Sequence, residues 1–199
     1  MHEILVLYYS RQGSTAALAR QICRGVETVA GMKARLRTVA PLTTTIERSD
    51  PEVPDDGPPY ASHADLETCS GLILGSPTRF GNMAAPLKHF WDGTGALWLS
   101  GVLVDKPAAV FTSTQTMHGG QESTLLSMML PLLHHGMFLV GVPYTHQGLS
   151  DTRSGGTPYG ASHVAASSGH GTLADVERDL AQALGARVAS LASRLQRAA

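Results

Sequence analysis

The sequence predicts a doubly wound α/β fold, with a five-stranded parallel sheet in the order 2-1-3-4-5 and helices on both faces. Strand and helix patterns alternate from one end of the chain to the other, and no segment repeats another. Several strand candidates are short continuous apolar runs, which is typical of parallel strands covered on both faces. At 199 residues the chain suits one such domain and is short for two, so we expect a single domain over residues 1–199.

The N-terminal elements follow from the spacing of apolar residues. Residues 4–7 are a continuous apolar run and predict the first strand. After a polar loop at 10–15, apolar side chains recur at helical spacing, at Ala19, Ile22, Cys23 and Val26. Residues 33–39 alternate basic and apolar side chains, which favours an edge strand. Residues 40–63 are rich in Thr, Pro and Asp and predict a long exposed connection.

The middle of the chain repeats this alternation of strand and helix. Residues 71–75 predict the third strand, and a helix is expected from about Ala84, with Pro86 tolerated in its first turn. A Gly/Trp/Leu-rich excursion is expected between Asp92 and Lys106. Residues 108–111 then predict the fourth strand.

The C-terminal part completes the pattern. A polar loop at 112–120 leads into a helix at 121–135, in which Pro131 predicts a kink. Residues 137–142 predict the fifth strand, and residues 143–171 a second long excursion. The last helix is expected over 173–195, because its apolar stripe keeps helical spacing at Val176, Leu180, Leu184, Val188, Leu191 and Leu195.

Composition excludes several classes of function. The net charge of −1 favours neither nucleic acid nor an anionic membrane as a partner. The apolar run at 4–9 is too short for a signal peptide, and no stretch approaches the roughly 20 apolar residues of a membrane span. Two cysteines form no disulfide framework, so we expect a cytoplasmic protein.

The nine histidines do not predict a metal site. The chain contains no His-Glu-x-x-His and no Cys-x-x-Cys motif, and the adjacent His134 and His135 should point to different faces of a helix. A Walker-type phosphate loop and a Cys-x5-Arg loop are also absent. We therefore expect no metal.

The loop at residues 10–15, Ser-Arg-Gln-Gly-Ser-Thr, follows the first strand and opens a helix. Its three hydroxyl groups and the backbone amides of a helix N-terminus form a cradle for an anion. Without a Gly-x-Gly-x-x-Gly motif, a terminal phosphate monoester fits better than a dinucleotide pyrophosphate. Ordinary capping of the helix by Ser14 or Thr15 is the alternative.

Two more polar loops, 76–83 and 112–120, leave the carboxyl ends of the third and fourth strands. In a 2-1-3-4-5 sheet they emerge beside the first loop, at the switch point where such sheets bind ligands. Together the three loops predict a site for a mononucleotide such as FMN.

Six segments carry a resemblance to a known family. They are Leu-Tyr-Tyr-Ser at 7–10, Ser-Pro-Thr-Arg-Phe-Gly-Asn-Met at 76–83, Thr-Gly-Ala-Leu-Trp at 94–98, Gly-Gly-Gln-Glu at 119–122, His-His-Gly-Met at 134–137 and Gly-Gly-Thr-Pro-Tyr-Gly at 155–160. In this order the chain resembles the WrbA-type NAD(P)H:quinone oxidoreductases over nearly its whole length. Members of that family are flavodoxin-like, tetrameric FMN enzymes.

The resemblance implies an FMN-dependent oxidoreductase that transfers two electrons from NADH or NADPH to quinones, giving hydroquinones. The implied FMN-binding residues are Ser10, Arg11, Gln12, Gly13, Ser14, Thr15, Pro77, Thr78, Arg79, Phe80, Gly81, Asn82, Ser113, Thr114, Gln115, Thr116, Met117, His118, Gly119 and His134. Trp98 and Gln12 are the implied substrate contacts, and Trp98 is expected over the reactive face of the flavin. The chemistry is that of the flavin, with no catalytic side chain, and the expected assembly is a homotetramer built as a dimer of dimers.

The chain departs from the family pattern at three places. Gln12 stands where the family usually has an aromatic residue near the nicotinamide cofactor, and the loop at 112–120 is bulkier and one residue longer. Pro131 precedes His134 within the helix and could shift that histidine. The choice between NADH and NADPH, and the physiological quinone, stay open.

Other interpretations of these residues also stay open. A flavodoxin that carries single electrons is the main alternative, although such carriers usually have strong acidic charge. A regulatory flavin-binding module without turnover is another. Arg79 could be a surface ion-pair partner, Trp98 a core residue and His134 a helix C-terminal cap. Tyr159 is expected at an interface rather than in catalysis.

Overall fold

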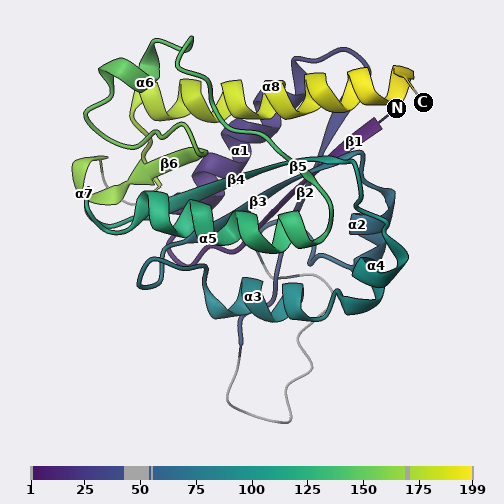
Figure 1. The fold of residues 1–199 in the computed structure, drawn as a ribbon. Helices are drawn as coiled ribbons and strands as arrows, with labels where there is room; N and C mark the ends of the chain where they lie inside the picture. The colour runs from purple at the N-terminus through teal and green to yellow at the C-terminus, as the bar shows by residue number, and fades with distance from the viewer. Residues whose placement is uncertain (1, 43–53, 55, 169–170, 199) are drawn as a thin grey trace.

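The computed structural model describes residues 2–42, 54, 56–168 and 171–198. Its sheet has the predicted order 2-1-3-4-5 (Figure 1). The strands along this path are β2 (Met32–Thr38), β1 (His2–Tyr8), β3 (Gly71–Pro77), β4 (Pro107–Thr114) and β5 (Phe138–Leu139), and every neighbouring pair is parallel. The predicted α/β class and the edge position of residues 33–39 are therefore confirmed.

The edge beyond β4 differs from the prediction, because two separate segments occupy the place of a fifth strand. β5 pairs with the start of β4, whereas β6 (Ala161–Val164) pairs with its end, from Phe111 to Thr114. The described part of the chain thus contains a six-stranded sheet rather than five strands, and only residues 138–139 of the predicted 137–142 form a strand. Gly160 allows the return to the edge, since a Cβ there would lie 2.1 Å from the Val110 carbonyl oxygen.

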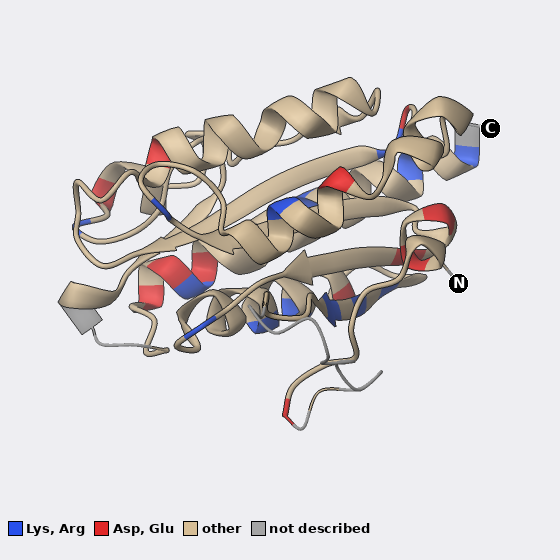
Figure 2. Ribbon diagram, turned by 90° about the horizontal axis from the view of Figure 1, so that it is seen from below, with Lys and Arg blue, Asp and Glu red and all other residues tan. Residues whose placement is uncertain are grey.

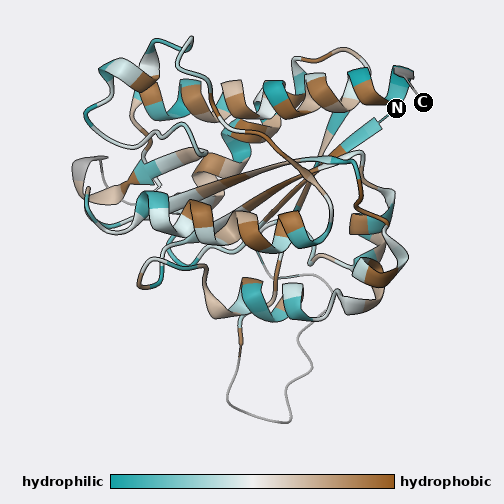
Figure 3. Ribbon diagram, in the orientation of Figure 1, coloured by the Kyte–Doolittle hydropathy of each residue, from teal (hydrophilic) through white to brown (hydrophobic). Residues whose placement is uncertain are grey.

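Helices cover both faces of the sheet, as a doubly wound fold requires (Figure 1). One face packs against α1 (Ser14–Glu27) and α8 (Asp175–Ala198), and the other against α2 (His63–Thr68), α3 (Ala85–Asp92) and α5 (Gln121–His134). Strand β1 serves both cores, since Ile4 and Val6 face the first layer and Leu5 and Leu7 the second. Figure 3 shows the apolar colouring of the central strands and of the helix surfaces that face them.

The two predicted excursions contain regular structure that the sequence did not indicate. Residues 92–106 include α4 (Gly95–Ser100), and residues 143–171 include α6 (Gly148–Asp151), β6 and α7 (Ala165–Ser168). Most of the predicted connection at 40–63 lies outside the described residues. Helix α2 begins at the end of this predicted connection, because Ser62 and Asp65 form a capping box there.

The last helix has the predicted apolar stripe. Leu180, Leu184 and Val188 are fully buried, whereas Leu195 is exposed near the C-terminus. Charged residues of both signs are spread over the helices and the sheet ends (Figure 2). Among the described residues, no helix combines the length and apolar character that a bilayer span requires.

Candidate functional site

The loop after β1 is shaped to present backbone amides. Gly13 is the N-cap of α1, with a φ of 87°, and no side chain caps the helix. The capping role considered for Ser14 or Thr15 is therefore not what the structure has. Instead, Ser10 Oγ accepts a hydrogen bond from the Gly13 amide at 3.2 Å, which curls the loop over the helix end.

Several donors of this loop have no acceptor. Within the described residues, no hydrogen bond engages the backbone N–H groups of Arg11, Gln12, Ser14, Thr15 or Ala16. Unpaired amides at a helix N-terminus carry partial positive charge, which the helix dipole reinforces. The side chains of Ser14 and Thr15 are buried beside them, 7% and 1% exposed. Such a set of donors fits a phosphate group, which offers only acceptors.

Two neighbouring strand ends close the cradle. Thr15 Oγ1 and Ser113 Oγ lie 2.8 Å apart, which ties the start of α1 to the end of β4. The Thr78 amide donates to the Ser113 carbonyl oxygen at 2.9 Å, so the end of β3 joins them. The three predicted loops therefore meet at the carboxyl ends of the strands, as expected for a ligand site at the switch point of the sheet.

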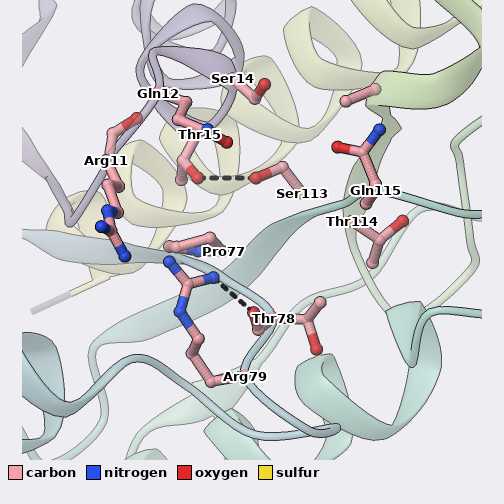
Figure 4. A pocket seen from close by; sticks show the side chains of 12 residues that line it. Arg11, Gln12, Ser14, Thr15, Pro77, Thr78, Arg79, Ser113, Thr114 and Gln115 are labelled. Atoms are coloured by element: carbon pink, nitrogen blue, oxygen red, sulfur yellow. Dashed lines mark hydrogen bonds between the residues drawn. The ribbon is translucent and has the colours of Figure 1, made fainter. Parts of the chain in front are cut away.

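A cavity of about 140 Å³ lies between these loops (Figure 4). It is lined by Ser10, Arg11, Gln12, Ser14, Thr15, Pro77, Thr78, Arg79, Ser113, Thr114, Gln115 and Ala165. All of these except Ala165 were predicted. The cavity is smaller than the ~300 Å³ at which small-molecule pockets begin, so it can take a phosphate and its immediate attachment rather than a whole flavin.

The segment after β6 also contributes to the cradle, which no sequence pattern predicted. The Ala166 amide donates to the Gln115 carbonyl oxygen at 3.0 Å, and the Gly171 amide donates to Ser14 Oγ at 3.3 Å. This segment therefore braces the cradle from the far side of β4. Its Gly/Ser-rich composition resembles an ordinary loop, so no signal in the sequence pointed to this role.

Residues 79–82 form a tight turn beside the cavity. The Arg79 amide donates to the Asn82 carbonyl oxygen at 2.7 Å and the Asn82 amide returns a bond at 3.0 Å. Both central residues have positive φ, 53° at Phe80 and 79° at Gly81, as a type I′ turn requires. A bulky residue rarely adopts this conformation, and it holds the Phe80 ring fully exposed.

The turn rests on the start of α5. Thr124 Oγ1 donates to Thr78 Oγ1 at 2.8 Å, and Ser127 Oγ donates to Asn82 Oδ1 at 3.3 Å. Other predicted residues do not line the cavity itself, namely Gly13, Phe80, Gly81, Asn82, Thr116, Met117, His118 and Gly119. They belong to the loops that form its rim.

Trp98 and His134 lie together, but away from the cradle. Trp98 Nε1 donates to the His134 carbonyl oxygen at 2.8 Å, and both residues line a separate cavity of about 460 Å³. His134 ends α5, whereas Gln121 begins it next to the loops; a helix of 14 residues is about 20 Å long. Within one chain these two residues are therefore not brought to the other predicted site residues.

His135, in the wall of this second cavity, is held by contacts with two neighbouring side chains. His135 is buried, whereas its neighbour His134 is exposed, and both line this cavity. Its Nε2 lies 3.1 Å from Thr94 Oγ1, and its ring packs edge-on against Trp91. Burial, with a smaller contribution from the charge of His134, lowers the pKa of His135. Trp98 is half-exposed, so it is not a core residue.

The buried carboxylate of Glu177 anchors the strand that lies beside the cradle. Glu177 at the start of α8 accepts bonds from His163 Nδ1 at 2.8 Å, Ser154 Oγ at 2.6 Å and the Val164 amide at 3.1 Å. Burial alone would raise the pKa of Glu177, but these bonds and one from the Ala174 amide outweigh it and lower the pKa to about 2. His163 is the register partner of Ser113, so this anchor holds β6 beside the cradle.

Comparison with known proteins assigns the chain to a family. The model of the family described as NADPH-dependent FMN reductase matches residues 3–147. A protein of Gluconacetobacter diazotrophicus named NAD(P)H dehydrogenase (quinone) is 44% identical over 198 residues, covering 98% of this chain and 99% of its own. A protein of the same name from Solidesulfovibrio magneticus is 41% identical over 201 residues, covering 97% of this chain and 98% of its own.

The solved structures agree on the fold. A flavodoxin described as WrbA-like, from Agrobacterium tumefaciens, superposes with a TM-score of 0.68 at 23% identity, over 98% of this chain and 99% of that one. At this level of identity the likeness concerns the fold alone. By sequence, the chain belongs to the NADPH-dependent FMN reductase family.

Proposed function

We propose that this protein is an FMN-dependent oxidoreductase that passes two electrons from NADH or NADPH to quinones. The observation that carries the proposal is the set of backbone amides and buried hydroxyls at the end of β1, which fits the phosphate of FMN; the amides have no acceptor within the described part of the chain. The relatives named NAD(P)H dehydrogenase (quinone) supply the reaction class, at 41–44% identity over nearly the whole chain.

In this proposal each loop of the site has its own task. Ser10 to Thr15 hold the phosphate with backbone amides, while Thr15 and Ser113 add hydroxyls. Residues 77–82 and 113–119 border the flavin ring, with Gln12 on the substrate side. FMN, when bound, supplies the chemistry by accepting two electrons from a nicotinamide donor and passing them to a quinone. The chain therefore needs no nucleophile or general base of its own.

The substrate side of the site is proposed to need a second copy of the chain. The cradle is too small to enclose a flavin, and Trp98 and His134 lie at the far end of α5. Helix α5 exposes Leu126, Leu130 and Leu133 on one face, an apolar surface of the kind that marks interfaces. A copy packed there could bring its Trp98 and His134 over a neighbour's cradle.

Closed symmetry makes a dimer or a dimer of dimers the natural assembly, and we propose the homotetramer. A single domain and a cytoplasmic location complete the proposal. The location is supported by Cys23 and Cys69, which are both free thiols.

The test of this function compares three flavins and then turnover. Fluorescence titration should give tight binding of FMN and much weaker binding of riboflavin, because riboflavin lacks the phosphate; FAD, whose phosphate is not terminal, should also bind weakly. The FMN-loaded protein should then oxidise NADH or NADPH with benzoquinone as acceptor. Equal affinity for FMN and riboflavin would contradict the phosphate cradle, and an absence of turnover with both donors would favour the electron-carrier alternative.

A further inference from the structure

A larger hollow of about 630 Å³ adjoins the cradle and shares Arg11 and Arg79 with it. Lys88, on the first turns of α3, adds a third cation to its wall. The rest of the wall includes apolar side chains, among them Tyr9 and Met83. The volume falls within the ~300–1,000 Å³ range of pockets that bind small molecules. Unlike the cradle, this hollow can accept a group of nucleoside size.

Within the part of the chain that the structure describes, the three cations of this hollow meet no carboxylate on its wall, although Lys88 is paired outside it. Among the described residues Arg11 has no ion pair or hydrogen bond through its side chain, and Arg79 Nη1 donates only to the carbonyl oxygen of Thr78. Lys88 contacts Asp92 at 2.5 Å on the exposed side of α3, but none of the described residues that line the hollow carries a carboxylate. In Figure 4 the guanidinium groups of Arg11 and Arg79 reach toward the same side of Pro77. Two cations that line the same hollow favour a bound anion.

The chemistry of the reactants selects the anion. Quinones are neutral, and the FMN phosphate is served by the amides of the cradle. The nicotinamide donor carries further phosphates, and NADPH differs from NADH by one phosphate on the adenosine ribose. Arginine is well suited to this 2′-phosphate, whereas sites for NADH place a carboxylate against the free hydroxyl.

We infer that the hollow binds the adenosine 2′-phosphate end of NADPH, with Arg11 and Lys88 on the phosphate and Arg79 at the border with the flavin site. The assignment rests on the proposed function and adds what that function leaves open, namely the preferred donor and the residues that choose it. It makes NADPH the better donor. Because the attraction is between exposed charges, the preference should shrink as ionic strength rises.

The direct test measures binding without turnover. Calorimetry on the FMN-loaded protein compares 2′,5′-ADP, 5′-ADP and 5′-AMP. The first two carry the same number of phosphates, but only 2′,5′-ADP has one at the 2′ position. We expect 2′,5′-ADP to bind at least about tenfold more tightly than either of the others, as a charge-assisted contact should give. Equal affinity for the three nucleotides overturns the inference, and this comparison needs no variant.

Substitutions locate the contact. Arg11→Gln and Lys88→Gln should each reduce the advantage of 2′,5′-ADP, and the double variant should abolish it. The ratio of kcat/KM for NADPH to that for NADH should fall in parallel. Lys33→Gln is the matched control, because it removes one exposed cation from β2. A loss as large in Lys33→Gln as in Lys88→Gln would mean that net charge alone attracts the nucleotide, and would overturn the site.

The outcome is separable from that of the proposed function. If 2′,5′-ADP binds through Arg11 and Lys88 but neither donor is oxidised, the phosphate site stands and the oxidoreductase proposal fails. If both donors are oxidised with equal kcat/KM and the nucleotides bind equally, the oxidoreductase proposal stands and this inference fails.

Discussion

The indole Nε1 of Trp98 donates a hydrogen bond to the backbone carbonyl oxygen of His134, at 2.8 Å. This bond fixes α4 against the end of α5 and holds half of the Trp98 ring in solvent. A ring held rigid and exposed is suited to contact something outside its own chain.

Replacing Trp98 should therefore impair turnover more than folding. Trp98→Ala should lower kcat/KM with quinones by about tenfold or more, the effect expected for an aromatic contact with a planar substrate or cofactor, while unfolding free energy falls by about 1 kcal/mol. Leu99→Ala, which shortens the exposed neighbouring side chain, is the control. Wild-type efficiency of Trp98→Ala with both donor and quinone would exclude this residue from the site.

The phosphate cradle makes a second prediction. The double variant Ser10→Ala, Thr15→Ala should bind FMN more weakly by several kcal/mol in total, since charge-assisted hydrogen bonds contribute about 1.5–3 kcal/mol each. Thr15→Ala also removes the contact with Ser113, so the loss of stability without flavin should be measured alongside. Thr145→Ala changes an exposed threonine that does not line the cavity, and it should leave FMN affinity unchanged. Unaltered FMN affinity in the double variant would refute the cradle.

Glu177 should make stability depend on pH in the acid range. Its folded pKa of about 2 lies below the ordinary value of 4.5, so its contribution is present above about pH 4.5 and is lost as the pH falls toward 2. The shift corresponds to about 3 kcal/mol, as an order of magnitude. Glu177→Gln should therefore unfold at much lower denaturant concentration than wild type at pH 7, and the difference should narrow below pH 4.

Asp179→Asn, which alters an exposed carboxyl on the same helix, is the control for this experiment. It should differ little from wild type at any pH. A gap between Glu177→Gln and wild type that stays constant from pH 7 to pH 3 would show that the buried bonds, rather than the ionised carboxylate, account for the effect.

The proposed assembly predicts a coupling between FMN and oligomeric state. Leu130→Glu places a charge on the exposed apolar face of α5 and should dissociate the tetramer in light scattering. Because ligands bound at a shared border favour the assembled state, FMN should bind this variant more weakly. Leu195→Glu changes an equally apolar residue near the end of α8 and should stay assembled. A fully active monomer would contradict the shared site.

Local patterns in the sequence predicted most of the fold. Continuous apolar runs located the central strands, and the stripe through Leu180, Leu184 and Val188 located α8. Burial of a strand on both faces requires a continuous apolar run, and burial of one helix face requires apolar residues at helical spacing. The divided edge strand was not predictable, because β6 has only four residues and its pairing with β4 depends on a contact far away in the sequence. The helices α4 and α6 were not predicted, because they have only six and four residues and lie within Gly-rich stretches.

The site was predictable where loops follow strands, and less so elsewhere. The three loops meet because parallel strands have their carboxyl ends on the same side of the sheet; their residues at the site are 10–15, 77–79 and 113–115. The support from Glu177 and His163 could not be foreseen, since a Glu in the first turn of a helix is usually a solvent-exposed dipole partner. The distance of Trp98 and His134 from the cradle depends on the length and direction of α5, which only the folded chain reveals.

Two half-reactions, each followed by absorbance, show whether the bound flavin passes electrons from a nicotinamide donor to a quinone. Purified protein reconstituted with FMN is mixed anaerobically with NADPH or NADH, and the yellow flavin band is recorded before benzoquinone is added. The donor should bleach the band, one equivalent of quinone should restore it, and hydroquinone should appear in equal amount. A flavin band that neither donor bleaches, or a bleached band that quinone leaves unchanged, would contradict the proposed function.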